Sequence, residues 1–260
     1  MCTILYRTLM PETICWLHSV QNFMEMIPVY SWFSKALEEE FEELRLLKES
    51  PRGSVRLIRH QKSGQRFILR RFSGNGEVYR KLLDRSCRHL PLIYEAAEQG
   101  GENLVIEEFI EGDTLGFLLQ GAMFSQAETT QIVRQLCQAL WVLHSMGAVH
   151  RDIKPENVIL RGGDAVLIDF DAARLYKPEQ SGDTHVLGTT GFAAPEQYGL
   201  SQSDLRADIY SMGVLINVML TGQHPSKKLA EGRMGRIVEH CTRVNPEKRY
   251  RDILHLMEAL

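Results

Sequence analysis

Up to about residue 110, short apolar runs alternate with turn residues. Ser54–Arg59 and Arg66–Phe72 are strand-like runs on either side of a Gln-Lys-Ser-Gly turn at Gln61–Gly64. This arrangement predicts a β-hairpin. A further strand of mostly apolar residues is predicted at Asn103–Phe109, and a short helix at Glu77–Leu83.

After Gly112 the apolar residues follow a helical period instead. Ser125 and Glu128 have the spacing of a capping box, which predicts a helix start. Apolar residues then recur on one helical face until Gly147, which ends the predicted helix. These residues are Ile132, Leu136, Leu140 and Leu143.

The rest of the chain continues as helices with one strand pair. Strands are predicted at Val158–Leu160 and Ala165–Asp169, on either side of two glycines. A helix is predicted over residues 207–220, and two short helices within Ile237–Leu260, around an Asn-Pro pair. The pattern indicates an α+β fold: a small strand-rich lobe joined near Glu108–Gly112 to a larger helical lobe.

We therefore divide the chain into an N-terminal extension (1–34), a small lobe (35–111) and a large lobe (112–260). Lys35–Leu47, rich in glutamate, is interpreted as the entry to a helix or a strand. Glu12–Met26 could form a short amphipathic helix, either as a packing or poorly ordered extension or as a contact to a membrane or partner. No run of about 18 uncharged apolar residues occurs, so no stable membrane insertion is expected.

Composition and charge exclude some functions. The 260 residues carry a formal net charge of −3, which provides no basic footprint for nucleic acid. The cysteines form no C-x-x-C pair, so neither a zinc site nor a disulfide framework is indicated. We interpret them as free thiols in a reducing cytoplasm; they are Cys2, Cys15, Cys87, Cys137 and Cys241.

Three motifs carry the candidate chemistry. His150-Arg151-Asp152-Ile153-Lys154-Pro155-Glu156-Asn157 follows the capped helix, and Asp169-Phe170-Asp171 ends the second strand pair. Ala194-Pro195-Glu196 comes later. Here the chain resembles the protein kinases, specifically the Ser/Thr class. The resemblance covers about Leu44 to Leu260 and implies the two-lobed kinase fold, with an antiparallel-sheet N-lobe and a helical C-lobe.

The resemblance implies a role for each residue of the catalytic loop. Asp152 would orient the acceptor hydroxyl and take its proton, and Lys154 would reach the transferred phosphate of ATP. Asn157 and Asp169 would supply oxygen ligands for Mg²⁺, which prefers them. Thr189 corresponds to the threonine that contacts the catalytic Asp and Lys in Ser/Thr kinases.

Three more residues match the architecture of the family. Glu196 and Arg249 correspond to a pair that ties the activation segment to the large lobe. Asp208 corresponds to an aspartate that holds the backbone of the catalytic loop. If the pair is buried, removing either partner would be costly.

The nucleotide-binding lobe departs from the family pattern. Of the glycines in G-x-G-x-x-G-x-V, only Gly53 remains before Val55, and Pro51 removes a backbone donor. Lys48 and Arg52 could supply side-chain charge in place of a backbone cradle.

The family's strand lysine corresponds to Arg70, and Arg71 would point to the other face of the strand. Arginine keeps the charge but is longer and planar. Glu77 is the candidate partner from the following helix, unless it is an ordinary exposed residue at a helix start. We expect Arg70 to point toward Glu77 or Asp169.

Glu108 and Ile110 lie where the family contacts adenine. Glu107 stands where an apolar residue usually lines that site, and a buried carboxylate there would need a partner, with Arg70 as one possibility. Asp171 replaces the final glycine of Asp-Phe-Gly, which removes conformational freedom.

The expected function is transfer of the ATP γ-phosphate to Ser or Thr hydroxyls of a protein substrate. The intact catalytic loop favours this activity, whereas the altered nucleotide lobe favours a pseudokinase, a scaffold or nucleotide-sensing module with little or no transfer. A small-molecule phosphotransferase of the same fold is a further alternative. The segment around Ala194-Pro195-Glu196 argues against it, because it resembles one that receives a protein substrate.

A regulatory hypothesis concerns Arg151, which precedes the catalytic aspartate. In kinases this arginine often holds a phosphorylated activation loop, and Thr184, or else Ser181, lies in a polar stretch suited to modification. Alternatively, both are plain loop residues, because Asp183 could already supply negative charge.

Overall fold

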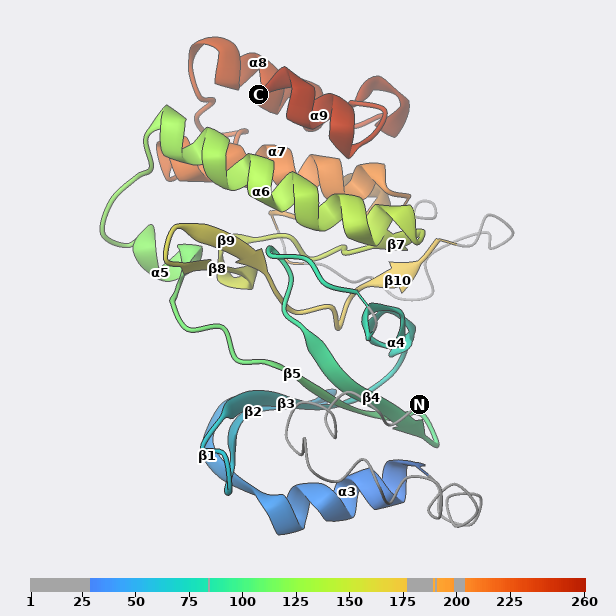
Figure 1. The fold of residues 1–260 in the computed structure, drawn as a ribbon. Helices are drawn as coiled ribbons and strands as arrows, with labels where there is room; N and C mark the ends of the chain where they lie inside the picture. The colour runs from blue at the N-terminus through green and yellow to red at the C-terminus, as the bar shows by residue number, and fades with distance from the viewer. Residues whose placement is uncertain (1–28, 84, 177–188, 190, 199–203) are drawn as a thin grey trace. The chain divides into compact units, whose positions relative to one another are not determined.

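The computed structural model describes residues 29–83, 85–176, 189, 191–198 and 204–260. They form two compact units. The first unit contains residues up to 86 together with 92–109, and the second contains residues 87–91 and 110–260. The first is built on an antiparallel sheet and the second mainly on helices, which confirms the α+β class (Figure 1).

The first unit contains a five-stranded antiparallel sheet with the strand order β1-β2-β3-β5-β4. The predicted hairpin and the predicted third strand are confirmed as β2, β3 and β5. The strands are β1 Phe41–Ser50, β2 Gly53–His60, β3 Arg66–Ser73, β4 Ile93–Gln99 and β5 Glu102–Glu108.

The sequence indicated neither β1 as a full strand nor β4. β1 is exposed along most of its length, so it lacks the alternation of a half-buried strand. In β4 the buried positions include Glu95 and Ala97. Because one is charged and the other is small, the strand does not show an alternation of large apolar and polar residues.

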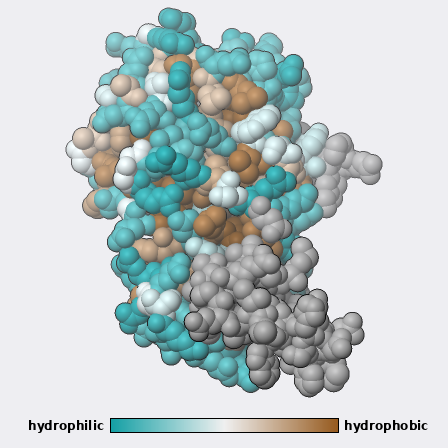
Figure 2. Space-filling view, in the orientation of Figure 1, coloured by the Kyte–Doolittle hydropathy of each residue, from teal (hydrophilic) through white to brown (hydrophobic). Residues whose placement is uncertain are grey.

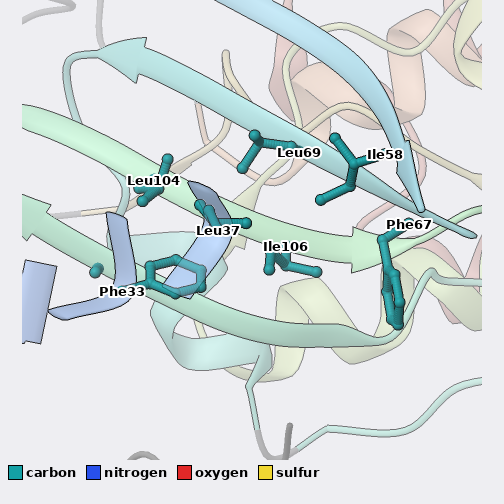
Figure 3. Packing of buried hydrophobic residues seen from close by; sticks show 8 residues of the cluster. Phe33, Leu37, Ile58, Phe67, Leu69, Leu104 and Ile106 are labelled. Carbon is teal, nitrogen blue, oxygen red and sulfur yellow. The ribbon is translucent and has the colours of Figure 1, made fainter. Parts of the chain in front are cut away.

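A helix before the sheet covers one of its faces. α3 (Val29–Glu40) runs directly into β1. The region Lys35–Leu47, predicted as the entry to a helix or a strand, therefore contains the end of a helix and the start of a strand. Phe33 and Leu37 of this helix pack against Leu69, Leu104 and Ile106 of the sheet (Figure 3). The boundary at residue 34 falls inside α3, while the helix considered at 12–26 lies outside the described residues.

In the second unit, helices α6 and α7 lie side by side, and α8 and α9 pack along them (Figure 1). A three-stranded sheet in the order β6-β8-β9 and the pair β7–β10 complete the unit. The helices are α5 Leu115–Leu118, α6 Gln126–Ser145, α7 Arg206–Thr221, α8 Gly232–Cys241 and α9 Ile253–Ala259. The strands are β6 Asp113–Thr114, β7 Ala148–Val149, β8 Val158–Arg161, β9 Asp164–Leu167 and β10 Arg174–Leu175.

The predicted helix signals in this unit are confirmed. The Ser125 hydroxyl accepts a hydrogen bond from the Glu128 amide at 3.3 Å, and the Glu128 carboxylate accepts one from the Ser125 amide at 2.8 Å. Gly222 ends α7 in the left-handed conformation, with φ 70°.

Two predicted boundaries were wrong. α8 begins at Gly232 rather than within Ile237–Leu260, and β9 ends at Leu167 rather than at Asp169. Asp169 cannot extend the strand because its φ is 69°.

The surface shown in Figure 2 is mixed, and hydrophilic residues interrupt its hydrophobic patches. The exposed large apolar side chains include Phe117, Trp141 and Val244. Among the described residues, no helix has both the length and the apolar character needed to cross a bilayer.

Candidate active site

The loop at residues 150–157 connects β7 to β8 and ends in a 3-10 helix at Pro155–Asn157. Its backbone is held by Asp208, a fully buried residue in the first turn of α7. The two carboxylate oxygens accept hydrogen bonds from the amides of Arg151 and His150, both at 2.9 Å. This contact confirms the architectural prediction for Asp208.

Asp208 remains a carboxylate despite its burial. Burial alone would raise its pKa, but the hydrogen bond from His144 Nε2 at 2.9 Å and the loop contacts hold the pKa below the usual range. His144 was not predicted from the sequence, because 64 residues separate it from Asp208 and no local pattern marks the contact.

The predicted catalytic residues meet around Asp152. Lys154 Nζ donates to Asp152 Oδ2 at 2.7 Å, and the Thr189 hydroxyl donates to Asp152 Oδ1 at 2.7 Å. Lys154 Nζ also donates to the Thr189 hydroxyl oxygen at 2.7 Å, which closes a triangle. Asn157 Nδ2 donates to the backbone oxygen of Asp152 at 2.8 Å and to Oδ2 at 3.0 Å.

These contacts determine the charge state of Asp152. Burial would raise the pKa of this carboxyl, but hydrogen bonds from Lys154 and Thr189 hold it below the usual range. The carboxylate is therefore ionised at neutral pH and can accept a proton from a hydroxyl placed beside it.

His150 links this loop to the segment that ends in Asp169. Its Nδ1 accepts a hydrogen bond from the Asp152 amide at 3.3 Å, and its Nε2 donates to the Ile168 carbonyl at 3.3 Å. Burial lowers the pKa of His150, so the ring is neutral and one nitrogen can accept while the other donates.

Asp169 is brought to the same loop by the backbone. The amide of Ile168 donates to the Asn157 carbonyl at 2.9 Å, and Asp169 follows directly. Asp169 and Arg151, with φ values of 69° and 70°, are the non-glycine residues with positive φ in the described part of the chain. Backbone strain of this kind often occurs at functional sites.

Asp171 does not adopt a positive φ. In this conformation its side chain therefore meets no backbone penalty, although the corresponding family position is glycine.

The expected link between the activation segment and the large lobe is confirmed. Arg249 binds Glu196 through two parallel hydrogen bonds of 2.6 and 2.8 Å, and both side chains are buried. This planar, bidentate arrangement is typical of arginine with a carboxylate.

On the first unit, Arg70 forms a buried ion pair with Glu107. Arg70 Nε lies 2.7 Å from Glu107 Oε1, and the two side chains are 4% and 3% exposed. The pair confirms the partner considered for Glu107. Glu77 begins α4 (Glu77–Leu82) and is half-buried; its pairing with Arg70, and an approach of Arg70 to Asp169, stay predictions.

The segment aligned with the Gly-rich loop is a tight hairpin turn. Ser50 on β1 pairs directly with Gly53 on β2, so only Pro51 and Arg52 form the connection. A side chain at position 53 would place its Cβ 2.0 Å from the Arg71 carbonyl oxygen. Glycine is therefore required for close strand packing, whatever its part in nucleotide binding.

Strand register places four residues in one row. Lys48 pairs with Val55, Val55 with Arg70, and Arg70 with Val105. Side chains that pair directly across strands share a face of the sheet, so Lys48 and Arg70 lie on the same face. This face is opposite to the one covered by α3.

The two residues expected at the adenine site belong to different units. Glu108 exchanges backbone and side-chain hydrogen bonds with Leu92, at 2.8 and 3.2 Å. Ile110 is buried in the second unit. Their contact with a nucleotide stays a prediction, as do the roles of Val55 and Gly53.

Gln197 is a second contact residue that was not predicted from the sequence. Its side chain is buried, with Nε2 donating to the Arg151 carbonyl at 2.8 Å and Oε1 accepting from the Ala194 amide at 3.0 Å. The position directly after Ala194-Pro195-Glu196 was the one available signal.

Comparison with known proteins gives consistent matches. Residues 53–255 match the protein kinase domain family. The chain is 36% identical over 141 residues to serine/threonine-protein kinase pkn2 of Myxococcus xanthus, covering 51% of this chain and 17% of that protein. It is 33% identical over 176 residues to PknL of Mycobacterium tuberculosis, covering 66% and 43%. It is 31% identical over 231 residues to Pkn1 of Myxococcus xanthus, covering 79% and 32%. The chain thus spans less than half the length of each.

Proposed function

This chain belongs to the protein kinase family, and we propose that it transfers the γ-phosphate of ATP to Ser and Thr hydroxyl groups of proteins. The observation that carries the proposal is the hydrogen-bonded triangle of Asp152, Lys154 and Thr189. It presents an ionised base and a cation side by side, as phosphoryl transfer requires.

In the proposed reaction, Asp152 accepts the proton of the substrate hydroxyl. The hydroxyl oxygen forms a bond to the γ-phosphorus while the bond to the leaving ADP oxygen breaks. Lys154 lies beside Asp152 and would place positive charge near the transferred phosphoryl group. Thr189 would hold both side chains in this orientation.

The chemistry of Asn157 and Asp169 fits Mg²⁺. An amide oxygen and a carboxylate are hard oxygen donors, and Mg²⁺ is commonly held by one or two protein ligands plus substrate phosphates. Hydrogen bonds from Nδ2 to Asp152 fix the amide of Asn157, so its oxygen is oriented. When bound, the metal would neutralise charge on the phosphates.

For ATP we propose Arg70 as the phosphate contact of the first unit, with Lys48 on the same sheet face. The tight turn at Pro51 favours side-chain charge over a backbone cradle. The alternative, a pseudokinase, draws its support from this altered turn. Glu108, Ile110 and Val55 would lie along the adenine base.

Protein substrates, rather than nucleic acid, suit the near-neutral chain. The described cysteines Cys87, Cys137 and Cys241 are free thiols, which fits a reducing compartment and leads us to propose the cytoplasm.

The experiment that tests the function has a transfer arm and a binding arm. Purified protein is incubated with γ-labelled ATP, Mg²⁺ and a general protein substrate, and the phosphoamino acids are identified. We expect labelled phosphoserine and phosphothreonine. In parallel, ATP with Mg²⁺ should raise the apparent unfolding temperature, because a ligand of the folded state stabilises it by about 2.7 kcal/mol at one hundred times its Kd.

The two arms separate the alternatives. Stabilisation without label in any substrate would indicate a pseudokinase. Label in a small molecule but in no protein would support the small-molecule phosphotransferase class. If the protein shows neither transfer nor stabilisation by ATP, the proposal is contradicted.

A regulatory prediction concerns Ser181 and Thr184, which lie outside the described residues. We expect phosphate on Thr184, or else Ser181, and lower activity in a Ser181→Ala/Thr184→Ala double variant. The reason is that a phosphate provides three acceptor oxygens for the guanidinium of Arg151. Mass spectrometry and transfer assays measure both effects; equal activity with no phosphate on either residue would retire the idea.

A further inference from the structure

Gln197 joins two backbone segments that are distant in the sequence. It lies in a 3-10 helix at Pro195–Tyr198, and its side chain is fully buried. Nε2 donates to the Arg151 carbonyl at 2.8 Å, while Oε1 accepts from the Ala194 amide at 3.0 Å. The two ends of the carboxamide therefore bind different segments.

The Arg151 backbone is held from both sides. Its amide donates to Asp208 Oδ1 at 2.9 Å, and its carbonyl accepts from Gln197. Between these two contacts the residue has φ 70°, a conformation disfavoured for a side chain with a Cβ. Because Asp152 follows directly, the direction of its carboxylate depends on this backbone.

The position of Gln197 is itself fixed by its surroundings. Glu196 is held by Arg249, and the Gln197 amide donates to the Ala194 carbonyl at 2.9 Å. Gln197 thus presents its carboxamide from an anchored backbone.

Helix α7 also connects the catalytic loop at 150–157 to the segment at 191–198. Asp208 binds the catalytic loop, and Ser211 Oγ donates to the Phe192 carbonyl at 2.9 Å. These residues are three positions apart and face the same side of the helix. With Gln197, the contacts form a closed ring through α7, the loop at 150–157 and the segment at 191–198.

We infer that Gln197 is a positioning residue for Asp152. It transmits the placement of the segment 191–198 to the catalytic aspartate through the carbonyl of Arg151. A change in the placement of this segment should therefore alter turnover. The inference rests on the proposed function of this site.

The test compares Gln197→Met with wild type. Methionine has a similar shape, but it cannot donate to the Arg151 carbonyl, and its thioether sulfur is only a weak acceptor for the Ala194 amide. We expect kcat to fall about 10–100-fold, because small displacements of a catalytic group have effects of this size. KM for ATP should change little, because no nucleotide contact is altered.

Gln135→Met is the matched control. Gln135 also accepts a backbone hydrogen bond through Oε1, from the Ala165 amide at 2.8 Å, but it does not touch the catalytic loop. Its substitution should lower the unfolding temperature and leave kcat of the folded protein unchanged. If Gln197→Met does not fold, Gln197→Asn replaces it, since its carboxamide is too short to span both groups.

Hydrogen exchange measures the same effect without turnover. In Gln197→Met, amides of residues 150–157 should exchange faster than in wild type, whereas Gln135→Met should leave them protected. Unchanged exchange in this loop, or a kcat equal to that of wild type, would overturn the inference. Absence of transfer by the wild-type protein would instead contradict the proposed function, and the exchange result would still stand.

Discussion

Replacement of Asp152 by asparagine is expected to lower kcat about 10²–10⁴-fold, the usual contribution of a positioned general base. Asparagine keeps the shape of the side chain and can still accept a hydrogen bond from Lys154. It cannot accept the proton of the substrate hydroxyl. Labelled-phosphate transfer at saturating ATP measures the loss, and nucleotide-dependent stabilisation should persist, because this substitution leaves the residues assigned to ATP unchanged.

Asp164→Asn is the control for this substitution. Asp164 also forms an ion pair, with Arg88 at 2.7 Å, but it lies on β9 and takes no part in the proposed reaction. Its transfer rate should match that of wild type. Full activity of Asp152→Asn would exclude Asp152 as the base.

The pKa of Asp152 gives this prediction a pH dependence. Since Lys154 and Thr189 hold the pKa below the usual value of about 3.9, protonation begins only at more acidic pH. Between pH 8 and 5 the carboxylate remains ionised, and kcat should not fall through this group. A loss of activity centred near pH 6 would assign the titration to another residue.

Glu107→Leu is expected to lower the free energy of unfolding by about 3–5 kcal/mol. The buried guanidinium of Arg70 loses the carboxylate that lies 2.7 Å from it, while its own desolvation cost remains. Urea denaturation measures the change, which is a large part of the stability of an ordinary domain.

Two controls test whether the loss of stability comes from burial of an unpaired charge. Glu98 forms an exposed pair with Arg80 at 2.8 Å, and Glu98→Leu should cost no more than about 1 kcal/mol. The double variant Arg70→Met/Glu107→Leu should be more stable than Glu107→Leu alone, because it removes both charges. Equal losses in the exposed and buried variants would show that burial of Arg70 adds no cost when its carboxylate partner is removed.

Local sequence patterns predicted most of the large lobe. Ser125 with Glu128 and the apolar stripe behind them defined α6, because a capping box and a helical period are both short-range signals. The cluster around Asp152 was predicted from the resemblance to the protein kinases, which also identified Thr189, 37 residues from Asp152.

The unpredicted features depend on contacts between distant residues. β1 is mostly exposed, so its pairing with β2 is not encoded as alternation. Gln197 and His144 reach backbone or carboxylate partners 46 and 64 residues away. Such contacts follow from the assembled fold, and no periodicity marks them beforehand.

The packing of α3 has a consequence for where a folded fragment can begin. Family similarity starts at residue 53, yet α3 and β1 both lie before that residue. A protein shortened to residue 53 would uncover Leu69, Leu104 and Ile106 and leave β2 as an open edge. Exposed apolar surface beside an open strand promotes aggregation. Soluble production of the first unit therefore requires about twenty-four residues that similarity alone would discard, counted from Val29 to Arg52.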